Sequence, residues 1–210
     1  MPNFNTLISP GKKLFEFPRN NYLYMSHIDS FVLLPTYPES INDSMAASYQ
    51  QSVPLGRSAP IFSYASSGPR QLQVSLHLHR DIMNEINKDV SNIKLSALGG
   101  VDPEVGITDD YIDVMIKQLQ AIAVPKYQAE SKMINPPTVS VRFGQIYIRG
   151  VVNGSVSVVS SLPLLQDDKY ALVDIAFTVS EIDPYSADTI AEQGQFRGFS
   201  RTLERRLWSK

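Results

Sequence analysis

TVSVRFGQIYIRGVVNGSVSVVSSLPLLQDDKYALVDIAFTVSEI, from Thr138 to Ile182, is the stretch that decides the fold. In its first run Val139, Val141 and Phe143 alternate with polar residues, which is the period of a strand with one buried face. Short turn-like breaks separate this run from three more of the same kind, at 146–152, 155–159 and 170–182. Four such runs predict an antiparallel meander whose one face is buried.

Length and composition limit the class of protein. The 210 residues are 43% hydrophobic and 19% charged, which fits one globular domain, and an all-β domain reaches this length. The net charge of -2 provides no basic surface for duplex DNA, so we expect no sequence-specific nucleic-acid binding. The absence of cysteine excludes disulfides and thiolate ligands. We expect a cytosolic, soluble chain with no membrane partner, because it has neither a secretory signal pattern nor an apolar run of about 20 residues.

The first half of the chain predicts strands, one undecided region and one helix. Residues 71–79 alternate most clearly, with Leu72, Val74, Leu76 and Leu78 on one face. Shorter candidate strands lie at 30–34, 46–50 and 61–64, whereas residues 80–108 follow no clear period. A helix is predicted at about 109–124, capped by Thr108 or Asp109. Its apolar stripe consists of Ile112, Met115, Ile116, Leu119, Ile122 and Ala123.

The two ends of the chain differ in character from the middle. Residues 1–26 mix prolines with aromatics, and we interpret them as an extended arm. Residues 186–210 form a basic amphipathic tail, which either docks on a partner or folds back onto its own sheet. Residues 27–185 would then form the β domain. The residues that would make the docking face of the tail are Phe199, Arg201, Leu203, Arg205, Leu207 and Trp208.

Only one pattern in the sequence points to chemistry. His77, His79 and Asp81 resemble the start of the His-x-His-x-Asp-His string of metallo-β-lactamase-type hydrolases, but the next residue is Ile82. The chain has one further histidine, His27, so a dinuclear site would lack imidazoles. No phosphate-binding loop or nucleophile elbow is present. We therefore predict no enzymatic activity, no catalytic or metal-binding residues and no cofactor. A metal-dependent hydrolase at His77 and His79 is kept as the third hypothesis, after the two functions given below.

The strand-rich stretch resembles the tube-like domain of baseplate proteins from contractile-tail bacteriophages, a domain shared with contractile injection systems. The resemblance lies in 141–144, 148–152, 155–158 and 171–182, and the run 53–62 is also similar to baseplate proteins. The residues that carry the pattern are Phe143, Gly144, Gly150, Val151, Val152, Phe177 and Glu181.

This resemblance implies a mainly β (α+β) fold: a tail-tube-like antiparallel β-sandwich or half-barrel with one packed amphipathic helix. It further implies a non-enzymatic virion protein that forms a ring, with six subunits favoured, at the baseplate hub and initiates the tail tube. The implied partners are the tail tube, the hub or spike and other baseplate proteins, and assembly would take place in the host cytoplasm. Members of the family often carry a peptidoglycan-binding LysM module, so a cell-wall-binding baseplate module is the alternative function.

Overall fold

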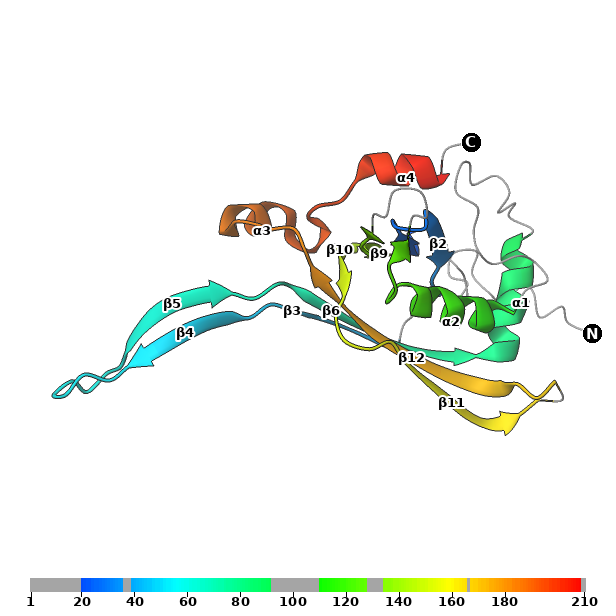
Figure 1. Cartoon of the computed structure of the whole chain (residues 1–210), viewed down its shortest axis with the longest axis horizontal. Helices are drawn as coiled ribbons and strands as arrows, with labels where there is room; N and C mark the ends of the chain where they lie inside the picture. Colours follow the sequence, from blue (N-terminus) through cyan, green and yellow to red (C-terminus); the bar gives the residue numbers. More distant parts are fainter. Residues whose placement is uncertain (1–19, 36–38, 92–109, 128–133, 166, 209–210) are drawn as a thin grey trace, which may run out of the picture.

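A computed structural model of the chain describes residues 20–35, 39–91, 110–127, 134–165 and 167–208. Within them the fold is mainly β with a few helices, which confirms the predicted class (Figure 1). The large antiparallel sheet contains β1 (Asn21–Met25), β2 (Ser30–Leu33), β3 (Ser40–Ser44), β6 (Gln71–His79), β9 (Val139–Phe143), β10 (Ile146–Val152), β11 (Ser157–Leu164) and β12 (Tyr170–Glu181). Two small sheets pair β4 (Ala47–Ser52) with β5 (Ile61–Ser67), and β7 (Lys126–Tyr127) with β8 (Ile134–Asn135). The helices are α1 (Arg80–Ser91), α2 (Tyr111–Ala121), α3 (Ala187–Gln193), the 3-10 turn η3 (Gly194–Phe196) and α4 (Arg201–Trp208).

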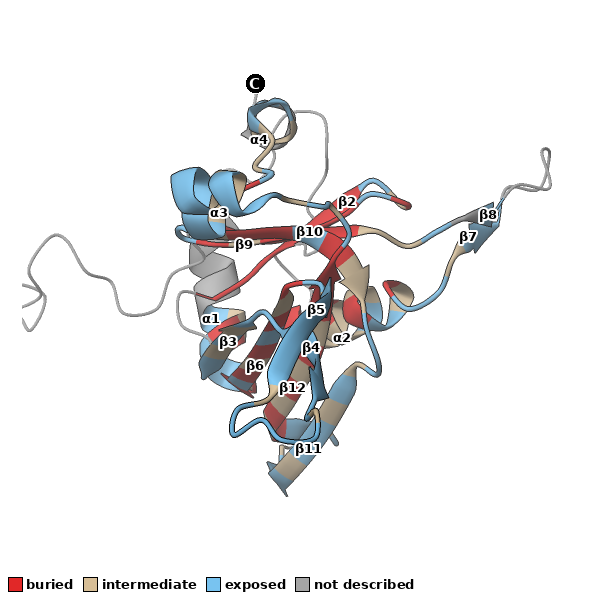
Figure 2. Cartoon of the chain, turned by 90° about the vertical axis from the view of Figure 1, so that its left-hand side faces the viewer, coloured by how far each residue is buried: buried red, intermediate tan, exposed pale blue. Residues whose placement is uncertain are grey.

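The large sheet is open, and β12 joins its two halves. The order is β2-β1-β9-β10-β12-β6-β3, with β11 also paired to β12. One edge of β12 pairs with β6, and its other edge is shared by β10 and β11. Figure 2 shows the half formed by β9 and β10 running across the half formed by β6, β11 and β12.

At the expected break around Asn153 and Gly154 the chain passes from β10 to β11, and both strands pair with β12. Gly150 pairs with Glu181 and Ser157 pairs with Ala176, so eight residues on one side lie opposite six of β12. The two extra residues are accommodated around Gly154, whose φ of 87° is one that glycine adopts without strain. β10 and β11 therefore follow one another along the same edge of β12, and the bend between them turns the first half of the sheet into the second.

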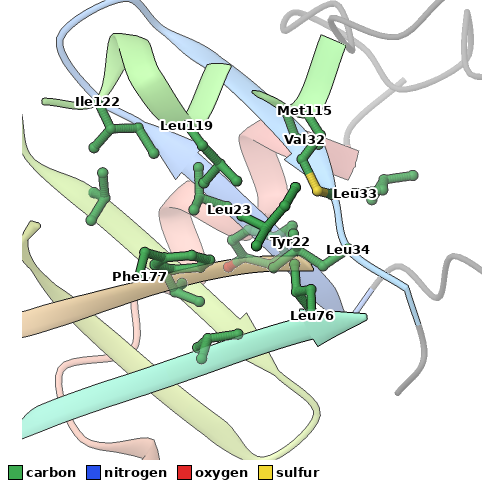
Figure 3. Packing of buried hydrophobic residues seen from close by; sticks show 14 of the residues in the cluster. Tyr22, Leu23, Val32, Leu33, Leu34, Leu76, Met115, Leu119, Ile122 and Phe177 are labelled. Atoms are coloured by element: carbon green, nitrogen blue, oxygen red, sulfur yellow. The ribbon is translucent and has the colours of Figure 1, made fainter. Parts of the chain in front are cut away.

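The core fills the angle between the two halves, with α2 lying over it. Met115 and Leu119 of α2 and its C-cap residue Ile122 meet Leu23 from β1 and Phe177 from β12, as Figure 3 shows. All five are at most 2% exposed. Since burial of each such side chain contributes about 1.5–3 kcal/mol, this cluster makes α2 and both halves of the sheet one cooperative body.

Two predicted boundaries differ from the structure. Residues 21–25, assigned to the arm, form β1 between β2 and β9, and all five are buried. Because this strand is covered on both faces, it shows no alternation that the sequence could reveal. Residues 1–19 of the predicted arm lie outside the described residues. The undecided region begins with α1, and its remainder from 92 onward also lies outside them.

The predicted helix exists as α2, although it is shorter than expected and has a different cap. Asp110 is the N-cap residue, and its carboxylate accepts hydrogen bonds from the backbone N–H groups of Ile112 (3.1 Å) and Asp113 (3.3 Å). Thr108 and Asp109, the predicted caps, lie outside the described residues. No helix in the described parts of the chain is long and apolar enough to cross a membrane.

Candidate functional site

Two strand edges of the large sheet, at β3 and at β11, pair with no further strand among the described residues. The unit β3-β6-β12-β11 ends on one side at β3, which β4 extends, and on the other side at β11. β11 contains no charged residue, and Val159 (53%) and Leu162 (70%) are exposed. Natural proteins usually protect such edges with charges, bulges or a covering element. Near its end β11 contains Pro163 and a bulge between Ser161 and Leu164, whereas residues 157–161 carry none of these devices.

A hairpin arm projects from the body as the continuation of β3 and β6. The arm is formed by β4 and β5, lies far from the core in Figure 1, and every residue of both strands is exposed. The backbone N–H of Gly68 donates to the carbonyl of Ala46 (2.8 Å), which joins the arm to the base of the hairpin. Tyr49 and Tyr64 lie opposite each other with ring centroids 5.7 Å apart. The sequence indicated these strands but not their exposure, because aromatic residues in strands are usually buried.

The outer face of the four-stranded unit is polar and weakly charged. Its polar residues, which alternate with the core, are Gln71, Gln73, Ser75, His77 and His79 on β6 and Asp174 and Thr178 on β12; Leu172 and Ala176 of β12 lie on the same face. His77 Nδ1 pairs with Asp174 across the strands, and both side chains are at least 40% exposed. This face is largely exposed to solvent, and apart from the pair of His77 with Asp174 its polar groups on β6 and β12 are mostly uncharged amides and hydroxyls.

The histidines proposed for a hydrolase do not converge with a third ligand. His77 and His79 share the outer face, while His27 lies elsewhere, with Nε2 3.3 Å from the carbonyl oxygen of Ala121. Among the residues that can be described, no group of three or more His, Cys, Asp or Glu side chains could hold a metal ion.

The residues of the predicted tube-domain pattern occupy structural positions around the joint between β10 and β12. Phe143 and Phe177 lie in the core, and Val151 and Val152 are half-buried at the joint. Gly144 forms the β9–β10 turn with a φ of 56°. Gly150 lies against the backbone of β12, where a Cβ atom would be 2.0 Å from the carbonyl oxygen of Ser180.

Glu181, the last residue of this pattern, belongs to a buried ionic network that sequence reasoning missed. Arg197 donates to its carboxylate (2.9 Å), and Arg70 Nη1 lies 3.9 Å away. Arg70 itself is 2% exposed, binds both carboxylate oxygens of Asp43 (2.7 Å each) and donates to the carbonyl of Tyr147 (2.9 Å). The network thus ties the hairpin base, the end of β12 and the C-terminal segment together.

The C-terminal segment folds back onto β9 and β10 of its own chain. Phe199 packs edge-on against Tyr147 at 5.4 Å and stacks with Phe196 at 4.2 Å, and Arg142 lies over both Phe rings. Leu203 is half-buried against the core. This matches the intramolecular alternative for Phe199 and Leu203, whereas Arg201 and Arg205 remain exposed. The side chains of Leu207 and Trp208 lie outside the described residues.

A second ionic cluster holds α2 against α1 and the β11–β12 loop. The carboxylate of Asp110 forms ion pairs with Arg80 Nη1 (2.6 Å) and with Lys169 Nζ (3.1 Å). Arg80 also donates a hydrogen bond to the carbonyl of Tyr170 (2.9 Å). Burial acts to raise the pKa of the Asp110 carboxyl, but the hydrogen bonds from Arg80 and Lys169 outweigh it and hold this pKa below its ordinary value.

This lowered pKa predicts that Asp110 makes the fold sensitive to acid. The unfolded chain binds the proton of this carboxyl more tightly than the folded chain does. The ionised carboxyl therefore stabilises the fold fully above the ordinary carboxyl pKa, and this stabilisation is lost as the pH falls through the lowered pKa of the folded chain. Asp110→Asn keeps a capping side chain but removes the titrating group. Urea unfolding between about pH 5 and about pH 2 should show a smaller loss of unfolding free energy for this variant than for the native chain. The control Asp167→Asn, at an exposed carboxyl, should keep the native loss; equal slopes for all three proteins would contradict the prediction.

Comparison with known proteins adds no relationship to these observations. No protein-family model matches the chain, and no curated protein is significantly similar to it in sequence. The fold and its surfaces are therefore the basis for the function proposed below.

Proposed function

We propose that the chain is a structural subunit of a contractile phage tail, which closes into a ring at the baseplate hub and initiates the tail tube. The observation that carries this proposal is the pair of open edges, β3 with β4 on one side and β11 on the other. Two different edges on one sheet favour a head-to-tail contact, and such contacts close into rings when the rotation between subunits allows it.

The directions of the strands support edge-to-edge pairing. β3 is antiparallel to β6, β6 to β12 and β12 to β11, so β3 and β11 of one chain run in opposite directions. A neighbour related by rotation about an axis roughly along the strands presents its β11 antiparallel to this β3. Each subunit then adds four strands to a continuous antiparallel sheet in which no edge is left exposed. The expected ring order of six comes from the family resemblance.

The polar outer face supports the same proposal. In a ring formed in this way one face of the joined sheets lines the central opening, and the core side faces outward toward the helices. Neutral side chains such as Gln73 and Ser75 would line the opening with groups that hydrogen-bond to water and bind a passing polyanion weakly. In this proposal the protein acts by shape in the virion, contacts the tail tube, the hub or spike and other baseplate proteins, and catalyses no reaction.

A charge placed on the open edge tests the proposal. We expect Val159→Lys to prevent ring formation, because a lysine on an edge strand opposes pairing with a second strand. The matched control is Val124→Lys, since Val124 is equally exposed (56% against 53% for Val159) but lies beyond α2, away from both edges. Mass photometry and electron microscopy of the purified proteins, alone and with tail-tube protein, measure the outcome. The proposal is overturned if the native chain remains monomeric under all conditions. It is also overturned if Val159→Lys forms the same rings as the control.

A further inference from the structure

The tip of the hairpin arm carries large apolar side chains that the described chain does not cover. Leu55 is fully exposed, Val53 is 67% exposed and Ile61 is 43% exposed. Only one residue between positions 44 and 69 is charged, namely Arg57 at this tip. An isolated two-stranded hairpin is marginally stable in water, and an uncharged apolar hairpin is prone to association. The arm is therefore built to lie against another surface.

The opposite end of the same sheet has matching chemistry. The β11–β12 hairpin ends in exposed Leu162 (70%), Leu164 (51%) and Tyr170 (40%). Its loop carries Asp167 and Asp168, both exposed. The neighbouring Lys169 binds Asp110 and Asp113 at 3.1 Å each and lies 3.9 Å from Asp167, so this one lysine faces more carboxylates than it can neutralise and the end of the hairpin keeps a negative character.

The two ends lie at opposite extremes of the sheet along the strand direction. In Figure 1 the arm extends to one side of the body and the β11–β12 hairpin to the other. They belong to one continuous ladder, because β5 leads into β6 and β6 pairs with β12. Two copies aligned head-to-tail along the strands therefore bring the apolar tip and Arg57 of one chain to the apolar end and the carboxylates of the other.

We propose that the arm tip docks on the β11–β12 end of a second copy of this chain, stacked along the strand direction. This inference rests on the proposed function. It assigns the contact between two stacked rings, whereas the edges of β3 and β11 make the contact within one ring. The apolar side chains provide the area removed from water, and the pairing of Arg57 with Asp167 and Asp168 selects the head-to-tail orientation.

Cross-linking tests the contact directly, because the native chain has no cysteine. A mixture of Leu55→Cys and Leu164→Cys proteins should form a two-chain disulfide under mild oxidation, and neither protein should form one alone. Both positions are at least half exposed, so neither change disturbs the core. Self-linking of Leu55→Cys, which would indicate arm-to-arm contact, or the absence of any link in the mixture would overturn the inference.

Charge reversal provides the second arm of this experiment. Adding Arg57→Glu to the Leu55→Cys protein should lower the yield of the disulfide about tenfold, because like charges then face each other. Adding Asp167→Arg and Asp168→Arg to the Leu164→Cys partner should restore it. An unchanged yield after the first reversal, or no recovery after the second, would contradict the assigned orientation.

The proposed ring and the proposed stacking contact fail separately. With Val159→Lys in both proteins the ring should be lost while the disulfide still forms. Rings without the disulfide would overturn the stacking contact alone. If chains that keep Val159 form the disulfide but never make rings, the proposed function alone is overturned.

Discussion

Arg70→Met should lower the free energy of unfolding by about 3–5 kcal/mol, because it removes one partner from a buried ionic network. The native guanidinium is 2% exposed and satisfies Asp43, the carbonyl of Tyr147 and the carbonyl of Gln195 at 2.7–3.3 Å. Methionine fills part of the volume but donates no hydrogen bond. Asp43 and Glu181 would then lose a positive charge that lies within 4 Å of each.

Urea unfolding followed by circular dichroism measures this loss, and the melting temperature should fall by roughly 6–20 °C for a chain of this size. The control is Arg149→Met, because Arg149 is 54% exposed and its contact with Asp183 is 3.9 Å long. An exposed pair of this kind contributes about 0–1 kcal/mol, so the control should unfold almost as the native chain does. Similar losses for the two variants would show that the network contributes nothing beyond surface charge.

The sequence predicted the parts of this fold whose two faces differ. β6 and β12 alternate because one face meets the core and the other is more open to solvent. β9 and β10 alternate in residue type, although the C-terminal segment covers part of their second face. β1 was missed because it is buried on both faces. The arm was indicated only as short strands, since no local pattern states that aromatic strands will project away from their own core.

The site could be predicted only where it depends on local sequence. Gly144, Gly150 and Glu181 were named as part of a pattern, and the structure gives each a physical role. The partners of Glu181 could not be found, because Arg70 and Arg197 are separated from each other by 127 positions and meet only after the sheet and the tail have folded. The free edges depend likewise on strand order, which alternation does not determine.

Gly150→Ala should destabilise the chain by about 3 kcal/mol or more, at the upper end of the cost of overpacking. The added Cβ would lie 2.0 Å from the carbonyl oxygen and 2.7 Å from the carbonyl carbon of Ser180. Both are backbone atoms of a central strand, so rotation of a side chain cannot relieve the clash. The pairing of β10 with β12, which spans only Gly150, Val151 and Val152, must open instead.

The same change tests how the two halves of the sheet are joined. Gly68→Ala is the matched control, because its nearest neighbour would be the carbonyl oxygen of Ala46 at an ordinary 3.5 Å, so we expect a change within about 1 kcal/mol. Hydrogen exchange should show faster opening of β10 and of the end of β12 in Gly150→Ala, while β6 and the inner part of β12 keep their protection. If both glycine variants unfold at the native urea concentration, close packing at this joint does not hold the halves together. A joint of three residue pairs must be tightly packed to fix the angle at which the four-stranded unit is presented to its neighbours, and that angle would set how many subunits close the proposed ring.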